Sequence, residues 1–422
     1  MYLIKKHSPF LFMQLWWVFW LAAANIGATG LVTPSITTNL LAVLLSLTTI
    51  CGYVLMHYFP REYKLIRYGG DDNSFLNKLH KINKFIFNAI LIVDGFYCYK
   101  AIKIFIDEGI IGYRIKTFST YNTPSILYGS AQVELTHLII IEPLSLFFMI
   151  SSITLYLYKA DIKYLYCAFL IAFIQSIIVM GRFNLYTLVV LTIYGGYVYG
   201  KKFKIKLLFL SLLIISIILV GVSTLRDNYE GKNVLVEIAS SSVYDYHVIG
   251  FLLFDKAIND KNSFINNEIT YGRAVFGGID RAVTLLISRF DKSFELGLKN
   301  TGADRQDRID VSNQRNEIRE YNAHYTIMYL LYSDGGVIGI MFFGMFYGII
   351  SAFILKKYYY SNSPKYFLAI MLLFNASFLA IFTSPLESVG YWGCVFITYL
   401  TSKKIKMFRS QQPHDNLFAQ VS

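Results

Sequence analysis

The chain has 422 residues, of which 55% are hydrophobic and only 16% are charged, and its mean hydropathy is +0.46. A soluble domain carries about 25% charged residues, so this composition excludes an ordinary soluble protein and favours one surrounded largely by lipid. The net charge of +12 does not indicate nucleic acid binding, because Lys and Arg stand in short clusters between apolar runs. Such clusters are the orientation signal of a multi-pass membrane protein.

Ten stretches are apolar enough to predict membrane spans, each of which needs roughly 20 mostly apolar residues. The sequence therefore predicts an all-α, polytopic bundle of about ten transmembrane helices. The predicted spans are 9–28, 36–58, 85–105, 136–157, 163–180, 184–200, 207–224, 324–354, 366–383 and 387–402.

The distribution of positive charge predicts the orientation of these spans. The segments placed inside hold 20 Lys and Arg residues, against 3 in the short loops placed outside, and short loops rich in Lys and Arg stay in the cytoplasm. Both termini are therefore expected on the cytoplasmic side of the membrane. An alternative for the first segment is a cleaved signal peptide, which would leave the remaining topology unchanged.

This topology divides the chain into four parts around one large outer loop between the seventh and eighth helices. Within the loop, Val234–Ile258 has amphipathic spacing that could lie along the membrane surface, and Gly272–Ile287 looks helical and basic. The loop is expected to cap a site formed with the helices. The four parts are a seven-helix part (1–224), the extracytoplasmic loop (225–323), a three-helix part (324–402) and a cytoplasmic tail (403–422).

Two arginines are expected at the outer membrane interface, on separate helices. Arg182 lies in the turn between the fifth and sixth helices, and Arg226 follows the seventh helix. Guanidinium groups at this depth suit a lipid-linked phosphate, which they can bind through two parallel hydrogen bonds. The structural alternatives are a snorkelling side chain for Arg182 and a salt bridge with Asp227 for Arg226.

Three further arginines in the loop recur at intervals of eight residues: Arg273, Arg281 and Arg289. On one helix, side chains at this spacing drift slowly along one face. They could form a basic ladder for an acidic or phosphorylated ligand, and a merely solvated face explains them equally well.

The stretch 320–339 is the most informative one, because the loop re-enters the membrane there. His324 could accept a proton from an attacking hydroxyl near neutral pH. Tyr321 and Tyr325 lie in the same stretch, and Asn322 lies between them. Asp334, followed by two glycines, is expected to break the eighth helix and cap its continuation, or to contact substrate.

Weaker candidates are ionisable residues inside or beside predicted spans. His247 is a rival to His324 as a base. Asp94 and Lys100 could neutralise each other or face a cavity, and Glu142 and Glu387 are possible intramembrane acids. No phosphate-binding glycine loop, HExxH motif or ligand-spaced Cys/His cluster occurs, so neither a metal nor a cofactor is predicted.

Taken together, Gly181-Arg182, Arg226 after the helix that precedes the large loop, and the Asn-Ala-His-Tyr-Thr…Tyr-Ser-Asp-Gly-Gly-Val-Ile-Gly stretch resemble the Wzy-type O-antigen and capsule repeat-unit polymerases. The related O-antigen ligases share this layout. The resemblance implies undecaprenyl-pyrophosphate-linked oligosaccharides as substrates, on the outer face of the membrane, and catalysis without a metal. It implies that Arg182 and Arg226 hold the pyrophosphate, and that Asn322 or His324 occupies the catalytic place at the end of the loop.

The expected function is therefore a glycosyltransferase that polymerises lipid-linked repeat units into O-antigen or capsular polysaccharide. Arg182, Arg226 and His324 are the predicted catalytic residues. The predicted partners are the lipid-linked substrate, membrane lipids and a chain-length regulator, with no nucleic acid. The alternatives are a ligase that transfers finished glycan to another acceptor, and a lipid-linked oligosaccharide flippase or other transporter, which would be expected to show internal pseudo-symmetry. The predicted residues that contact substrate are Arg273, Arg281, Tyr321, Asn322, Tyr325 and Asp334.

Overall fold

The computed structural model describes residues 2–58, 69–117, 125–181, 183–200, 238–287, 309–312, 320–321, 325–381 and 383–403. These residues are overwhelmingly helical, which confirms the predicted all-α class. The β-structure among these residues is a short antiparallel pair of strands, β1 (Ile309–Asp310) and β2 (Glu320–Tyr321), and an isolated β-bridge between Leu31 and Ser312.

Nine of the ten predicted stretches coincide with helices, and the tenth, 207–224, lies outside the described residues. The predicted helix in Gly272–Ile287 is found as α12, which begins five residues later because residues 271–276 form turns. The helices are α1 (Tyr2–Ile26), α2 (Ile36–Tyr58), α3 (Gly69–Thr117), α4 (Ala131–Thr136), η1 (His137–Ile141), α5 (Glu142–Lys159), α6 (Lys163–Ile178), α7 (Phe183–Tyr199), η2 (Ile238–Asp245), α10 (Tyr246–Asn259), α11 (Phe264–Asn267), α12 (Gly277–Ile287), α13 (Ile327–Ser361), α14 (Pro364–Leu379), η4 (Pro385–Glu387) and α15 (Val389–Ser402).

Four of the described helical stretches are long and apolar enough to cross a membrane: 7–26, 36–58, 132–159 and 327–361. Three shorter apolar helices, α6, α7 and α14, accompany them. This pattern fits an all-α membrane protein, but the predicted count of about ten spans is not confirmed by length and composition. Several helices have only 14 to 17 residues, fewer than the roughly 20 that cross a bilayer at right angles.

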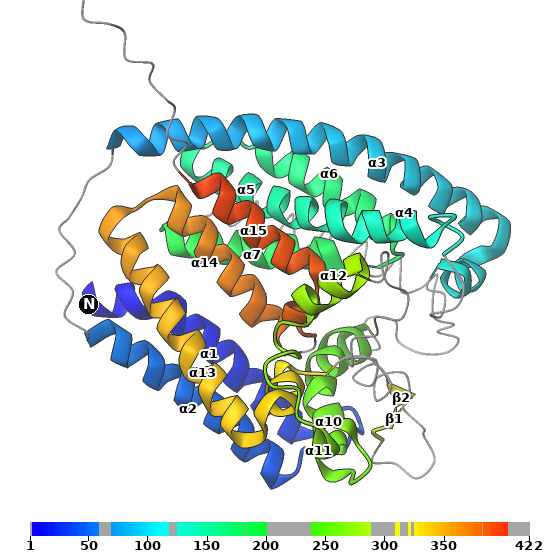
Figure 1. Cartoon of the computed structure of the whole chain (residues 1–422), viewed down its shortest axis with the longest axis vertical. Coiled ribbons are helices and arrows are strands. Elements are labelled where there is room, and N and C mark those ends of the chain that lie inside the picture. The colour runs from blue at the N-terminus through cyan, green and yellow to red at the C-terminus, as the bar shows by residue number, and fades with distance from the viewer. Residues whose placement is uncertain are drawn as a thin grey trace, which may run out of the picture.

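The helices form two groups that α14 connects (Figure 1). In the first group α13 packs along α2, beside α1. In the second group α3, α5, α6 and α7 pack against one another, and both α14 and α15 contact α5. The side chains that face outward from α2 and from the middle of α3, residues 85–106, are largely apolar, as expected for helices in contact with lipid.

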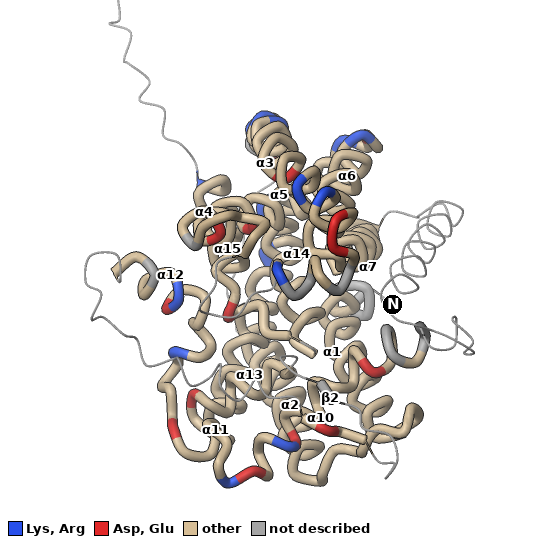
Figure 2. Tube along the Cα trace, turned by 90° about the vertical axis from the view of Figure 1, so that its right-hand side faces the viewer, with Lys and Arg blue, Asp and Glu red and all other residues tan. Residues whose placement is uncertain are grey.

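The chain reversals gather at two opposite ends of the bundle. At one, here called the tail end, the Lys78 Nζ donates to the Thr401 carbonyl at 2.9 Å and the Ser363 hydroxyl donates to Asp72 at 2.8 Å. At the other, here called the loop end, α10 and residues 309–312 meet the α1–α2 turn, where the Val32 N–H donates to the Val311 carbonyl and the Ser35 N–H donates to Asp255, each at 2.9 Å. Figure 2 shows charged residues beside the labels of α10, α11 and α12 at the loop end, and also beside those of α3, α6 and α14.

Helix α13 is broken where the sequence predicted a break. Gly335 and Gly336 have non-helical dihedral angles, and Gly336 has a φ of 58°, which lies in the left-handed region that favours glycine. The break follows Leu331 by about one helical turn. Asp334, just before the break, faces the segment 270–275 and accepts hydrogen bonds from it.

Candidate functional site

The residues that the sequence placed at the centre of the chemistry lie outside the described part of the chain. Arg182, Arg226, Asn322 and His324 are among them, as is Arg289. The neighbours of Arg182 are described: α6 ends in a turn in which the Gly181 N–H donates to the Ser176 carbonyl at 2.9 Å, and α7 begins at Phe183. Tyr321 is described only as a backbone position in β2. The predicted meeting of Arg182 and Arg226 therefore stays a prediction.

Two of the predicted substrate-binding arginines are described, at the loop end. Arg273 pairs with Asp280, with an N–O distance of 3.3 Å between the guanidinium and the carboxylate. Arg281 is exposed on α12 and attracts the carboxylate of Glu142 on α5. Because the pair with Asp280 is partly exposed, it contributes little stability.

Asp334 anchors the loop to α13. Its carboxylate accepts hydrogen bonds from the N–H groups of Ala274 at 2.9 Å and Val275 at 2.8 Å, and from the Thr270 hydroxyl. These are charge-assisted bonds in a buried place, which makes them strong. The segment that carries Arg273 is thus held at the broken turn of α13. Tyr325 is also buried, and its ring packs 4.5 Å from that of Tyr329.

A cavity of about 560 Å³ lies between α13 and α15, with α14 as its floor. Its lining is almost entirely apolar and aromatic. It extends from Val275 and Phe276 at the loop end to Lys365 and Ser402 at the tail end. Among the residues that line it are Trp17, Phe343, Phe346, Tyr347, Ile350, Ala369, Leu373, Ala376, Leu386, Tyr391, Trp392, Val395 and Tyr399.

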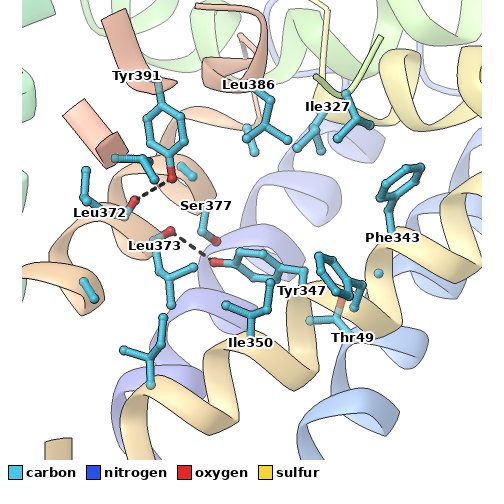
Figure 3. Close-up of a pocket in the computed structure, with 18 of the residues that line it drawn as sticks. Thr49, Ile327, Phe343, Tyr347, Ile350, Leu372, Leu373, Ser377, Leu386 and Tyr391 are labelled. Carbon is cyan, nitrogen blue, oxygen red and sulfur yellow. Dashed lines mark hydrogen bonds between the residues drawn. The ribbon is translucent and has the colours of Figure 1, made fainter. Parts of the chain in front are cut away.

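Figure 3 shows how two tyrosines of this cavity orient their hydroxyl groups. Tyr347 from α13 and Tyr391 from α15 both turn their hydroxyls toward the backbone of α14. The Tyr347 hydroxyl donates to the Leu373 carbonyl at 3.1 Å, and the Tyr391 hydroxyl donates to the Leu372 carbonyl at 3.3 Å. Their ring faces are left for the cavity, so the space suits a long apolar chain better than a polar ligand.

Sequence reasoning missed a buried polar cluster at the loop end. Asp94 on α3, which is fully buried, contacts His137 of η1 and Gln175 of α6, each at 3.0 Å. The predicted alternative of local neutralisation by Lys100 is not what the structure has, because the Lys100 Nζ donates to the Leu127 carbonyl at 2.9 Å. A signal was present: a histidine and an acid, His137 and Glu142, stand five residues apart in one predicted span, where ionisable residues are uncommon.

His247, the predicted rival base, is enclosed by protein. Its ring stacks on Trp20 with centroids 4.1 Å apart, its Nε2 is 3.0 Å from the Tyr186 hydroxyl, and its Nδ1 is 2.6 Å from the Val243 carbonyl. Burial lowers the pKa of His247 from 6.5 to about 4, although the hydrogen bond to Val243 acts in the opposite direction. Since the carbonyl can only accept, Nδ1 carries the proton and the ring is neutral.

The helix that carries His247 also differs from the amphipathic surface helix that its spacing suggested. Every residue from His247 to Phe254 is buried, and α10 packs against both α1 and α2. This helix is therefore part of the bundle at the loop end.

Within the described residues, no group of three or more His, Cys, Asp or Glu side chains could hold a metal ion. Comparisons with models of protein families, with curated proteins and with solved structures gave no match for this chain.

Proposed function

We propose that this chain is a multi-pass glycosyltransferase that polymerises undecaprenyl-pyrophosphate-linked oligosaccharide units at the outer face of a bacterial plasma membrane. In the reaction, a hydroxyl of one lipid-linked unit attacks the anomeric carbon of the growing chain, and undecaprenyl pyrophosphate leaves. Since this leaving group is already acidic, the main demand on the protein is to bind the carrier and stabilise the negative charge that grows on it.

The apolar cavity between α13 and α15 is the observation that carries this proposal. Along α15 its lining runs from Tyr391 to Ser402, about 16 Å at 1.5 Å per residue, or roughly half of a bilayer core of about 30 Å. A space of this length with an apolar lining suits one stretch of a polyprenyl chain. Its loop end reaches Val275 and Phe276, next to the segment that carries Arg273.

Cationic groups near this end of the cavity would bind the pyrophosphate. The hydrogen bond from the Ala274 N–H to Asp334 holds the segment that carries Arg273. Arg281 lies on α12, which packs against α15. In our proposal Arg182 and Arg226 join them. The proposed topology has about ten spans with both termini in the cytoplasm, so the loop end is the outer end.

The proposal is tested in the source bacterium by deleting the gene and complementing it with variants. We expect Ala369→Trp, which fills the floor of the cavity, to abolish long polymer and to cause single-repeat lipid-linked glycan to accumulate. Ala369→Ser leaves the space open and should behave as wild type. Leu170→Trp adds the same bulk at an exposed position on α6 and should have no effect. Polymer length is measured on gels, and lipid-linked glycan by chromatography of lipid extracts.

The arginines are tested in the same strain. Arg182→Ala should abolish long polymer while the protein stays in the membrane, and Arg182→Lys should restore only part of it, because an ammonium cannot form the paired hydrogen bonds of a guanidinium. Normal polymer length in Arg182→Ala would remove Arg182 from the mechanism. Accumulation of full-length polymer on the carrier after gene deletion would indicate a ligase instead.

A further inference from the structure

The cluster around Asp94 has the arrangement of an oriented acid–base group. Three segments far apart in the sequence meet there: α3 supplies Asp94, η1 supplies His137 and α6 supplies Gln175. The His137 Nε2 lies 3.0 Å from one carboxylate oxygen, and the Gln175 amide nitrogen lies 3.0 Å from the other. Asp94 is fully buried, whereas the side chain of His137 is 11% exposed.

The hydrogen bonds decide which ring nitrogen is available. Gln175 donates a hydrogen bond to one oxygen of Asp94. An ionised carboxylate only accepts hydrogen bonds, so the ring nitrogen of His137 that faces the other oxygen is the donor. His137 therefore carries its proton on Nε2 and presents the lone pair of Nδ1. That nitrogen lies 3.4 Å from the Tyr128 hydroxyl, which is longer than a normal O–H···N contact. A ligand hydroxyl could replace Tyr128 at this position.

The position along the helix places His137 where a water-soluble glycan can reach it. His137 precedes Lys159, the tail-end residue of α5, by 22 residues, or about 33 Å along the axis. This is close to the thickness of the hydrocarbon core, about 30 Å. His137 thus lies near the membrane boundary at the loop end, where η1 also contacts α15.

Charged and titratable groups from several elements surround the ring. Glu142, exposed at the start of α5, interacts electrostatically with His137 and with Arg281 of α12. The rings of Tyr97 and Tyr128 lie 5.7 Å and 5.0 Å from that of His137. Exposed acidic and basic groups beside a partly exposed imidazole form a polar surface on which sugar hydroxyls can be bound.

The local backbone is also unusual. Residues His137–Ile141 form a π-helix between two α-helical stretches, and the Glu142 N–H donates to the His137 carbonyl. Single π-helical turns inside α-helices occur frequently at functional sites. Here the wider turn lies at the residue that carries the imidazole.

We propose that His137 is the general base for the acceptor sugar, with Asp94 as its positioning residue; this inference rests on the proposed function. The acceptor hydroxyl gives its proton to Nδ1 as its oxygen bonds to the anomeric carbon of the donor. The bond from that carbon to the phosphate oxygen breaks, and its electron pair leaves with undecaprenyl pyrophosphate. The imidazolium that forms is stabilised by the carboxylate of Asp94 and later releases the proton to water.

The test uses membrane vesicles that contain the full chain, supplied with the lipid-linked repeat unit extracted from the deletion strain. His137→Ala should lower the rate of elongation by about 10²–10⁴-fold, the usual contribution of a general base. Added imidazoles should restore elongation, and the restored rate should rise with the basicity of the imidazole used. His80→Ala is the matched control. It removes a histidine between α3 and α6, the two helices that carry Asp94 and Gln175, where His80 contacts Tyr164, and it should leave the rate unchanged.

Two further variants separate catalysis from folding. His137→Gln can still donate to Asp94 but cannot take up a proton, so it should keep the thermal midpoint of the wild type and lose elongation. Asp94→Asn should lower the rate while the KM for the acceptor stays unchanged.

Elongation at the wild-type rate by His137→Gln would overturn the inference and leave His324 as the base. Loss of elongation in His137→Ala without rescue by any imidazole would also overturn the inference, because it would indicate that His137 has only a structural role. If wild-type vesicles fail to elongate the unit, the proposed function itself is wrong.

Discussion

His247 shows how burial changes the chemistry of a single residue. The sequence allowed it to be a base, since an exposed histidine in a loop titrates near neutral pH. The structure stacks it on Trp20 and binds both ring nitrogens, so its neutral form is favoured. A base must be able to take up a proton, and an imidazole whose pKa lies near 4 does so only in acid.

This burial predicts a dependence of stability on pH. The pKa of His247 is about 4 in the folded chain and 6.5 ordinarily, so between these values the unfolded chain binds a proton that the folded chain does not. The stabilisation is fully present above pH 6.5 and is lost as the pH falls toward 4, by about 3 kcal/mol in total.

The measurement is the thermal midpoint of the purified protein in detergent at pH 7.5 and at pH 5. His247→Phe keeps the stacked ring but removes the titrating group, so its midpoint should change less between the two pH values. An equal change in the variant and the wild type would assign the pH dependence to other groups.

Asp334 and His137 show that a sequence pattern can predict a helix break but not the tertiary partner of a side chain. The Asp-Gly-Gly sequence signals a break in a helix, because glycine adopts backbone angles that other residues avoid, and the break is found. That the carboxylate would bind the backbone of residues 274 and 275 depends on where the loop packs. The partner of Asp94 likewise comes from another helix, 43 residues away in sequence.

At the scale of elements, the closest packing joins α2 and α13. Gly344 and Gly348 on α13 and Gly52 on α2 allow the two backbones to approach, and a Cβ placed on Gly348 would come within 2.0 Å of the Thr49 carbonyl oxygen. Small residues four apart are the usual means of close helix contact in membranes, where lipid offers no hydrophobic driving force between helices.

This contact predicts the effect of one methyl group. Gly348→Ala should lower the stability by about 1–3 kcal/mol, as for other overpacked interiors. Gly95→Ala is the matched control: nothing lies within 4 Å of the added Cβ on α3, and alanine in a helix is favoured over glycine by roughly 0.5–1 kcal/mol.

Thermal midpoints in detergent compare the two variants. A midpoint for Gly348→Ala as high as that of the wild type would mean that α2 and α13 do not pack as closely as described.

Helix α3 illustrates why element boundaries differed from the predicted span. Hydropathy predicts the apolar window 85–105, whereas the helix extends over Gly69–Thr117, with a break at Gly109, whose φ is 69°. Its start carries Lys78, which reaches the end of α15. A hydropathy window detects only the apolar part of a helix. Polar helical ends beyond it are stabilised by tertiary contacts, which hydropathy does not report.

At the scale of the whole molecule, the two ends of the bundle predict the sidedness of the protein. Described lysines such as Lys78, Lys159 and Lys403 lie at the tail end, which should therefore face the cytoplasm. In a variant without native cysteines, Lys261→Cys at the loop end should react with a membrane-impermeant maleimide on intact cells. Asp161→Cys at the tail end should react only after the membrane is opened. Reaction of both cysteines on intact cells would contradict this topology.

The sequence by itself determined the class of the protein and the places of its helices, because hydropathy and charge act locally and are read directly from neighbouring residues. It also located the break at Gly335–Gly336. Only the tertiary structure decided that α10 is buried, that Asp94 pairs with His137 and that a long apolar cavity lies between α13 and α15. These features depend on contacts between helices far apart in the chain, and within a membrane nearly every helix is apolar on all sides, so the pattern of a single helix does not reveal its partners.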